Sequence, residues 1–327
     1  MSNVPIHLPL PPLLPFTMSV EEGTHKLPDG LEAYTKTWKS DGQPRAIIAF
    51  IHGFSDHCNA YYELFPTLAS SGIEIRAFDQ RGWGRTFKTP KERGNTGGTD
   101  VVLADIHSFL LSIVPHAAAS NTPLFLMGHS MGGGEVLNYV LHPDSPYYQA
   151  SPRPKLAGLL AYSPLVALHP STRPFRITVA AGRLTARLFP RMQRASPIDP
   201  TIVSRDPQVA TDYVNDELSH DIGTFGGLAG MLDRGLWLEK LSQGDVKGME
   251  LLPMWFAHGD ADQVTSWDAT KRLAGLLGSK GDVVFCSYDG GYHRLSADLK
   301  ETTDKFVKDL LDWILARSPL DGNKAKL

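Results

Sequence analysis

The sequence predicts an α/β fold in which a mostly parallel central sheet carries helices on both faces and a helical cap is inserted. Three observations predict it. Short apolar runs alternate with segments whose apolar residues recur every three or four positions. A sharp glycine-flanked turn, Gly128-His129-Ser130-Met131-Gly132, joins one such run to one such segment. The alternation stops between 164 and 250, where prolines interrupt each helix-like stretch.

The length of 327 residues suits one α/β core with an insertion better than two large domains. The breaks in pattern divide the chain into five parts. They are an extended proline-rich arm (1–16), the first part of the core (17–163), the cap (164–250), the second part of the core (251–317) and a tail (318–327).

The core begins with an antiparallel hairpin, expected over 17–26 and 31–38, because Pro28-Asp29-Gly30 is typical of a turn. Buried strands are predicted at 46–51, 73–78, 124–127, 156–162, 254–257 and 283–287. Helices are predicted at 60–70, 101–114, 133–141, 267–277 and 301–316. No strand is expected in the cap.

Composition excludes several classes of protein. A net charge of −3 and a pI near 6.5 give no electrostatic footprint for nucleic acid. The two cysteines, Cys58 and Cys286, cannot form a disulfide framework and are interpreted as buried, inert thiols. The apolar segment 6–16 carries four prolines and no preceding Lys or Arg, so it is neither a signal peptide nor a spanning helix. No other stretch approaches the roughly 18 uninterrupted apolar residues of a bilayer span.

The last three residues, Ala325-Lys326-Leu327, are a conservative variant of the Ser-Lys-Leu address that the peroxisomal import receptor reads. Two interpretations stay open. The tripeptide is an import address, or it is the end of a basic tail that carries no address. The chain is therefore expected in the cytoplasm or the peroxisome, and not outside the cell.

The turn around Ser130 has the pattern of a nucleophile elbow, because an apolar run precedes it and a helix-compatible run follows. Gly128 and Gly132 supply the positions without side chains that such a turn needs. The following helix points its first amides at the serine, so the Met131 N–H can donate to an oxyanion formed there.

A serine hydroxyl does not attack an ester unaided, so the elbow predicts a histidine base and a carboxylate later in the chain. Asp260 and Asp262 both follow a predicted strand. Asp262 is favoured because the acid needs loop length to reach the imidazole, whereas Asp260 suits a turn beside Gly259. His293 follows the last strand and two glycines, which let its loop reach Ser130.

The second oxyanion donor should be the backbone N–H of Phe54, in the loop after the strand at 46–51. His52 is interpreted as a brace of that loop. No G-x-G-x-x-G motif stands there, so no dinucleotide is expected, and neither a cofactor nor a metal is predicted. Asp79 and Arg81 are expected to form a structural ion pair at a strand end.

The cap is locally basic. Between 165 and 198 there is no acidic residue, and Arg176, Arg183 and Arg187 fall on one helical face beside an apolar stripe. Two interpretations stay open: peripheral contact with a membrane or lipid-droplet surface, and a solvated arginine face above a packed cap helix. The arginines of this segment are Arg173, Arg176, Arg183, Arg187, Arg191 and Arg194.

Several blocks of the chain between 17 and 316 resemble the α/β-hydrolases, and within them monoacylglycerol lipases and lysophospholipases of fungal type. The blocks are His52-Gly53-Phe54, Phe78-Asp79-Gln80-Arg81-Gly82, Gly128-His129-Ser130-Met131-Gly132-Gly133, His258-Gly259 with Asp262, and Gly291-Tyr292-His293. The resemblance implies Ser130 as nucleophile, His293 as base, Asp262 as its orienting acid, and Phe54 and Met131 as oxyanion donors. It also implies that the cap covers an apolar acyl tunnel.

The chain departs from the animal monoglyceride lipases, which carry a glutamate and an arginine shortly after the oxyanion glycine. Asp56 and Ala60 stand at those places. Asp56 is expected to accept a hydrogen bond from a substrate hydroxyl, while the missing arginine removes a rigid donor fork.

The expected function is hydrolysis of a lipid ester, a monoacylglycerol above all, through an acyl-enzyme. A broad carboxylesterase, a lysophospholipase or an acyl thioesterase would use the same residues under a cap of different shape. A non-catalytic binding protein of the same fold is the alternative from another class.

Overall fold

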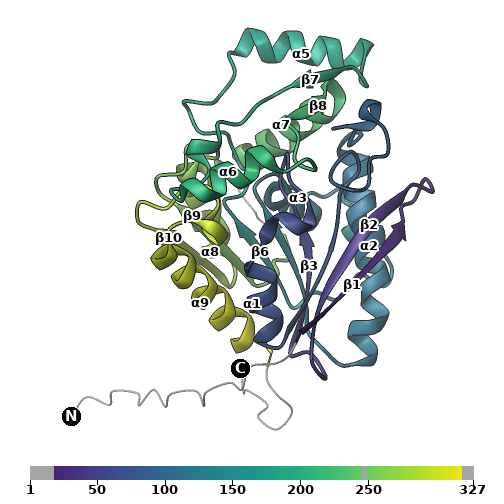
Figure 1. Cartoon of the computed structure of the whole chain (residues 1–327), viewed down its shortest axis with the longest axis vertical. Coiled ribbons are helices and arrows are strands. Elements are labelled where there is room, and N and C mark those ends of the chain that lie inside the picture. Colours follow the sequence, from purple (N-terminus) through teal and green to yellow (C-terminus); the bar gives the residue numbers. More distant parts are fainter. Residues whose placement is uncertain (1–17, 245–248, 319–327) are drawn as a thin grey trace.

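The computed structural model describes residues 18–244 and 249–318 (Figure 1). The proline-rich arm predicted over 1–16 and the terminal Ala325-Lys326-Leu327 lie outside the described residues. The cytoplasmic or peroxisomal location stays a prediction.

An eight-stranded sheet forms the centre of the molecule, in the order β1-β2-β4-β3-β5-β6-β9-β10. The first two strands form the expected hairpin and pair antiparallel, as do β2 and β4, while all other neighbours pair parallel. The strands are β1 Met18–Lys26, β2 Glu32–Ser40, β3 Ala46–Ile51, β4 Ile73–Phe78, β5 Leu124–His129, β6 Gly158–Tyr162, β9 Met254–Gly259 and β10 Val283–Tyr288. The predicted mostly parallel α/β sheet is confirmed.

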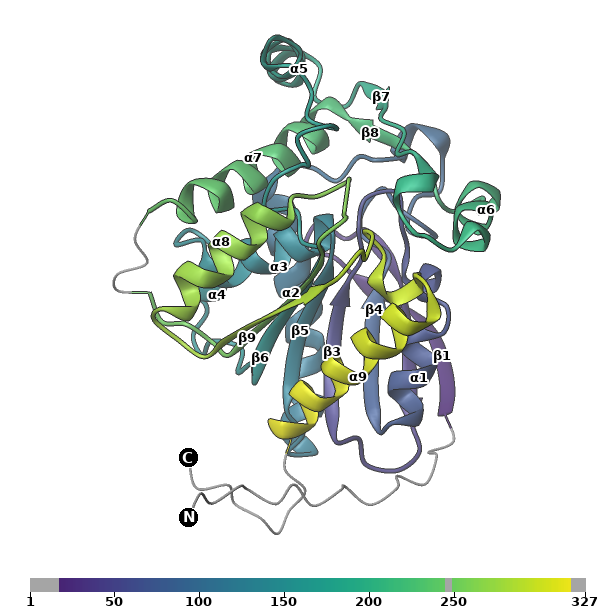
Figure 2. The same cartoon turned by 90° about the vertical axis from the view of Figure 1, so that its left-hand side faces the viewer.

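Helices cover both faces of this sheet (Figure 2). Strand alternation divides β3 between two apolar clusters, since Ile47, Ala49 and Ile51 face one cluster, and the residues between them face the other. The first cluster includes side chains of α2 (Thr99–Ala119), α3 (Met131–Leu141) and α8 (Trp267–Gly278). The second includes side chains of α1 (Leu64–Ser70) and α9 (Lys300–Ala316). A one-turn helix, α4 (Pro146–Gln149), follows α3.

Within the two described ranges, α2 is the one helix that is long and apolar enough, by length and composition, to cross a membrane. Its side chains Ile106, Phe109 and Leu110 are buried in the first apolar cluster. Asp105 of the same helix accepts hydrogen bonds from Arg81. The helix thus packs against the sheet in the manner of a core helix.

Arg81 does not pair with Asp79, so that expectation was wrong. The guanidinium of Arg81 binds Asp29 and Asp105 instead. Asp79 accepts the backbone N–H groups of Cys58 and Arg85 at 2.8 and 2.7 Å. Side chains that are close in sequence at a strand end can point in different directions. Asp79 and Arg81 therefore each bind partners that are near in space and not each other.

The cap region lies between β6 and β9, beyond the carboxyl ends of the parallel strands (Figure 1). It contains two three-residue strands, β7 and β8, which pair antiparallel, so the expectation of a strandless cap was wrong. Neither strand has an apolar run that would indicate it, because Gln193 and Arg194 of β7 are polar and exposed, and β8 consists of Ile222, Gly223 and Thr224. The elements are α5 Arg176–Leu188, β7 Gln193–Ala195, α6 Pro207–Asn215, β8 Ile222–Thr224 and α7 Phe225–Leu241.

Candidate active site

Ser130 occupies the turn between β5 and α3 with a strained backbone, at φ 55° and ψ −118°. A methyl group at Gly128 would overlap the backbone of Gly132, and one at Gly132 would overlap the carbonyl oxygen of Ile51. Strand β3, strand β5 and helix α3 therefore approach so closely that only glycine fits on either side of the serine. This is the local geometry that the pentapeptide predicts.

A continuous line of hydrogen bonds connects Ser130, His293 and Asp262. The Nε2 of His293 lies 2.9 Å from the Oγ of Ser130, and its Nδ1 lies 2.8 Å from the Oδ2 of Asp262. All three side chains are buried. They come from the carboxyl-end loops of β5, β9 and β10, so the topology of the sheet brings together residues that are far apart in sequence.

Asp262 is held as a carboxylate by its neighbours. Its Oδ1 accepts the backbone N–H groups of Val264 and Thr265 at 2.7 and 3.0 Å, and its Oδ2 also accepts from His258 Nε2 at 3.0 Å. Burial alone would raise the pKa of Asp262, but the charge of His293 and the hydrogen bonds from both histidines hold it below its ordinary value. A fixed, ionised acid can orient the imidazole and stabilise its protonated form.

Asp260, the competing acid, is exposed and lies at a turn. Its Oδ1 accepts the backbone N–H of Gly290 at 2.7 Å. The structure thus brings Asp262, and not Asp260, to His293.

The oxyanion loop, residues 52–57, follows β3 and lies beside the elbow. Phe54 and Met131 line the same pocket as Ser130, and Met131 is the first residue of α3. Across 18–244 and 249–318, no acceptor takes the backbone N–H of either residue. His52 braces the loop, because its Nε2 accepts the N–H of Gln80 at 2.8 Å. Two free amides beside one serine hydroxyl are what an oxyanion site requires.

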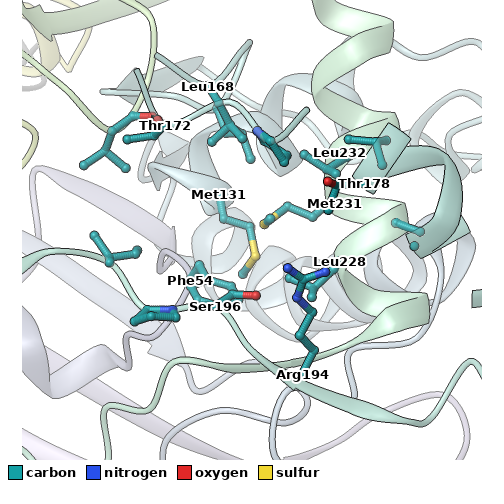
Figure 3. Close-up of a pocket in the computed structure, with 18 of the residues that line it drawn as sticks. Phe54, Met131, Leu168, Thr172, Thr178, Arg194, Ser196, Leu228, Met231 and Leu232 are labelled. Carbon is teal, nitrogen blue, oxygen red and sulfur yellow. The ribbon is translucent and has the colours of Figure 1, made fainter. Parts of the chain in front are cut away.

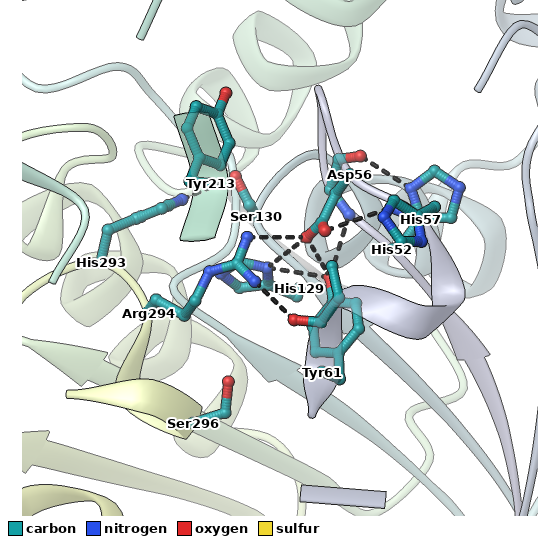
Figure 4. Close-up of polar contacts among 12 residues, drawn as sticks. His52, Asp56, His57, Tyr61, His129, Ser130, Tyr213, His293, Arg294 and Ser296 are labelled. Carbon is teal, nitrogen blue, oxygen red and sulfur yellow. Dashed lines mark hydrogen bonds and ion pairs between the residues drawn. The ribbon is translucent and has the colours of Figure 1, made fainter. Parts of the chain in front are cut away.

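The position of Asp56 does not fit the expected role of binding a substrate hydroxyl. Its side chain is buried and is absent from the pocket wall. Its Oδ2 accepts from Tyr61 at 2.8 Å and from Arg294 at 3.1 Å, and its Oδ1 accepts the N–H of His57 (Figure 4). Burial would raise the pKa of Asp56, but the guanidinium of Arg294 holds it well below the ordinary range. Asp56 is a structural carboxylate beneath the site.

Sequence reasoning missed Arg294, which directly follows His293. Its side chain is buried and donates to Asp56 and, at 2.8 Å, to the carbonyl oxygen of Ala60. The guanidinium of Arg294 therefore lies beside residue 60, whose own side chain, an alanine, supplies no cation. The alanine at 60, where the resemblance to animal monoglyceride lipases leads one to expect an arginine, together with an arginine beside the base, was the available signal.

A buried ion pair links the nucleophile helix to the cap. Arg234 of α7 donates to the Oε1 of Glu135 of α3 at 2.8 Å, and both side chains are almost fully buried. Burial raises the pKa of Glu135 to about 7, although Arg234 acts in the opposite direction. The group is therefore close to titration at neutral pH.

We expect this pair to make stability depend on pH. Between the ordinary value of 4.5 and about 7, the folded chain holds a proton on Glu135 that the unfolded chain has released. The free energy of unfolding should therefore decrease as the pH rises through this window. Urea unfolding of wild type and Glu135→Gln at about pH 5 and pH 8 measures this, and the variant should show the smaller change. Equal changes in both proteins would contradict the assignment.

A pocket of about 550 Å³ opens beside Ser130 beneath the cap (Figure 3). Its volume lies within the roughly 300–1,000 Å³ typical of small-molecule sites. Most of the wall is apolar and comes from the cap and its flanking loops, with Arg194 extending its guanidinium toward the cavity. Apolar lining residues include Leu165, Leu168, Phe225, Leu228, Met231 and Leu232. In the described part of the chain, no group of three or more His, Cys, Asp or Glu could hold a metal ion.

A family model described as serine aminopeptidase, S33 (Hydrolase_4) matches residues 42–300, more than three quarters of the chain. The chain belongs to this α/β-hydrolase family. The α/β-hydrolase is 34% identical to a Schizosaccharomyces pombe protein named "Putative monoglyceride lipase", over 88% of this chain and 72% of that protein. It is 27% identical to the monoglyceride lipase of Homo sapiens, with 90% of each chain covered.

Solved structures agree with this membership. The α/β-hydrolase is 27% identical to the monoacylglycerol lipase of Paleococcus ferrophilus, with a TM-score of 0.68 over 88% of this chain and 100% of that one. A soluble variant of the monoglyceride lipase of Saccharomyces cerevisiae, in complex with a substrate analogue, gives a TM-score of 0.79 at 22% identity, over 97% and 100% of the two chains. The second similarity is one of fold.

Proposed function

We propose that this chain is a serine hydrolase that cleaves a long-chain monoacylglycerol to glycerol and a fatty acid through an acyl-enzyme. Ser130 is the nucleophile, His293 the general base and Asp262 the acid that orients it. The backbone N–H groups of Phe54 and Met131 stabilise the oxyanion. Relatives named as monoglyceride lipases, with similarity over most of both chains, support this choice of ester.

The reaction proceeds in two halves. The Oγ of Ser130 attacks the ester carbonyl carbon while the Nε2 of His293 takes its proton, and the carbonyl electron pair moves onto the oxyanion. When the tetrahedral intermediate collapses, the bond to the glycerol oxygen breaks and His293 protonates that leaving group. Water then repeats the sequence on the acyl-enzyme, which releases the fatty acid and restores Ser130.

The observation that carries the proposal is that Ser130, which is hydrogen-bonded to His293 and through it connected to Asp262, lies at the wall of a mostly apolar pocket. An acyl chain can leave water for the leucine-lined cavity while its carbonyl group stays beside Ser130. Apolar burial contributes roughly 0.8 kcal/mol per methylene group, so a long chain gains several times more than a short one.

A panel of five substrates tests this function. It contains 1-oleoylglycerol, p-nitrophenyl butyrate, oleoyl-coenzyme A, oleoyl lysophosphatidylcholine and an aminoacyl anilide. We expect kcat/KM to be highest for 1-oleoylglycerol. Highest kcat/KM for the short ester, the thioester, the lysolipid or the anilide would assign the site to an esterase, a thioesterase, a lysophospholipase or an aminopeptidase. No turnover of any substrate would favour the binding-protein alternative.

We propose further that α5 contacts the surface of an anionic membrane or lipid droplet. It lies at the outer end of the cap (Figures 1 and 2). The apolar stripe that a packed cap helix would bury is exposed, with Ile177, Leu184 and Leu188 at 80, 60 and 64%. Phe175 and Phe189 flank the helix and are exposed too. Exposed apolar side chains beside arginines, on a segment without acidic residues, favour anionic lipid.

Vesicle sedimentation tests this contact. Wild type should sediment with vesicles that contain phosphatidylglycerol, and much less with pure phosphatidylcholine. Leu188→Ser should reduce sedimentation, whereas Val214→Ser, which changes a comparably exposed apolar residue of α6, should not. Equal sedimentation of the two variants would exclude α5 as the contact.

A further inference from the structure

The cap segment, residues 216–220, lies between α6 and β8 and contacts the region around the oxyanion loop in two places. One contact is made by Asp216 at its start, and the other by His220 at its end. Two turn hydrogen bonds within the segment, to Asp216 from the N–H groups of Leu218 and Ser219, restrict its shape. The segment can thus act as one unit on the loop.

The first contact joins Asp216 to His57, the last residue of the oxyanion loop. The Nε2 of His57 lies 2.6 Å from the Oδ2 of Asp216, and the imidazole is buried. The Nδ1 of His57 accepts the N–H of Asn59 at 3.2 Å, so Nε2 carries the proton and donates to Asp216. A buried donor whose partner comes from the cap would be left unsatisfied without it.

The second contact reaches Phe54 through Trp83. The ring of His220 stacks on Trp83, with centroids 4.6 Å apart and planes at 14°, and its Nε2 lies 3.0 Å from the carbonyl oxygen of Gly82. Trp83 is buried and packs edge-on against the Phe54 ring at 4.8 Å. The side chain of the proposed oxyanion donor therefore rests on an indole that the cap segment holds.

The loop between these contacts is under strain, because Ser55 has a φ of 58°. Such a backbone persists only where its surroundings determine it. We propose that the cap segment is a positioning element for the oxyanion loop: through His57 and Trp83 it directs the Phe54 N–H toward the developing oxyanion. Stabilisation of the transition state therefore depends on the contacts of the cap segment with His57 and Trp83. This inference rests on the proposed ester hydrolysis at Ser130.

The test compares Asp216→Ala with Glu217→Ala, which removes an exposed carboxylate one position further on. With p-nitrophenyl butyrate as a short soluble ester, Asp216→Ala should lower kcat about tenfold and leave KM within about twofold. Glu217→Ala should match wild type. Asp216→Asn keeps an acceptor for the His57 N–H, so it should recover most of kcat.

A second readout separates positioning from a loss of folded protein. A trifluoromethyl ketone adds to the serine and forms an oxyanion, whereas the matching trifluoromethyl alcohol is neutral and cannot add. Asp216→Ala should weaken binding of the ketone by the same factor as kcat/KM and leave the Kd of the alcohol unchanged. In a His57→Ala background, which removes the donor, Asp216→Ala should have little further effect, because the two residues act through one contact.

Three outcomes would overturn the inference: unchanged kcat and ketone affinity in Asp216→Ala, a loss confined to KM, or an equal loss in Glu217→Ala. Should Asp216→Ala fail to fold by circular dichroism, His220→Gln tests the Trp83 contact by the same criteria. A wild-type chain that hydrolyses no ester contradicts the proposed function and the inference together. An active wild type with an unaffected Asp216→Ala contradicts the inference alone.

Discussion

Replacing Ser130 with alanine should lower kcat for 1-oleoylglycerol on the order of 10⁶-fold, to the level that binding and the oxyanion donors alone provide. The reason is that the Oγ of Ser130 is the atom in hydrogen-bond contact with His293, so its removal leaves the base without a nucleophile. Activity and labelling by a fluorophosphonate probe measure the effect.

The fold should survive this change. Alanine keeps the Cβ of the elbow residue, and the glycines that permit its backbone are untouched. Circular dichroism and thermal unfolding provide the control. A folded Ser130→Ala protein that still hydrolyses the ester within tenfold of the wild-type rate would contradict the assignment of Ser130 as the nucleophile.

Asp262→Asn should cost on the order of 10⁴-fold in kcat with little change in structure. The neutral amide cannot stabilise the imidazolium that forms during attack. Its N–H₂ group also favours the wrong tautomer of His293, whose Nδ1 lies 2.8 Å from the carboxylate. Activity should be measured over a range of pH, so that a shift in the pH dependence of kcat is not mistaken for a complete loss of activity.

Asp260→Asn is the matched control, since it makes the same chemical change two residues earlier in the same loop. Asp260 is exposed and contacts the Gly290 N–H, so this variant should stay within a few fold of wild type. An inactive Asp260→Asn beside an active Asp262→Asn would reverse the assignment of the acid.

Strands were the most predictable elements, because a parallel sheet covered on both faces needs unbroken apolar runs. The bounds of β3 and β4 agree with the predicted 46–51 and 73–78. Strands β5 and β9 run two residues further than predicted, since His129 and Gly259 continue the pairing although they do not belong to an apolar run. Side-chain polarity does not report where backbone pairing stops.

Helix bounds were less predictable where the backbone breaks. The helix predicted over 60–70 is a short 3₁₀ turn, Cys58–Tyr61, followed by α1 from Leu64. Tyr62 lies between them with a φ of 27°, which interrupts the hydrogen-bond pattern. Apolar periodicity continues across such a break, because it records which face is buried and not the path of the backbone.

At the site, the residues with a strong local pattern were predictable and those defined only in space were not. Ser130, Asp262 and His293 each follow a recognisable strand, and the structure brings them within hydrogen-bond distance. The surroundings of Asp56 depend on Arg294, which lies 238 positions away. No local pattern shows that a carboxylate in a loop will be neutralised from so far along the chain.

The buried contact of Arg294 with Asp56 and the carbonyl oxygen of Ala60 has a consequence for evolution. We expect an arginine at position 60 to bind the same carboxylate that Arg294 binds, and one cation suffices for one acid in this confined space. A second would be left uncompensated, at a cost of several kcal/mol. Homologous chains with arginine at one position should therefore carry an uncharged side chain at the other, and exchanging the two residues in this protein should be tolerated better than doubling or deleting the arginine.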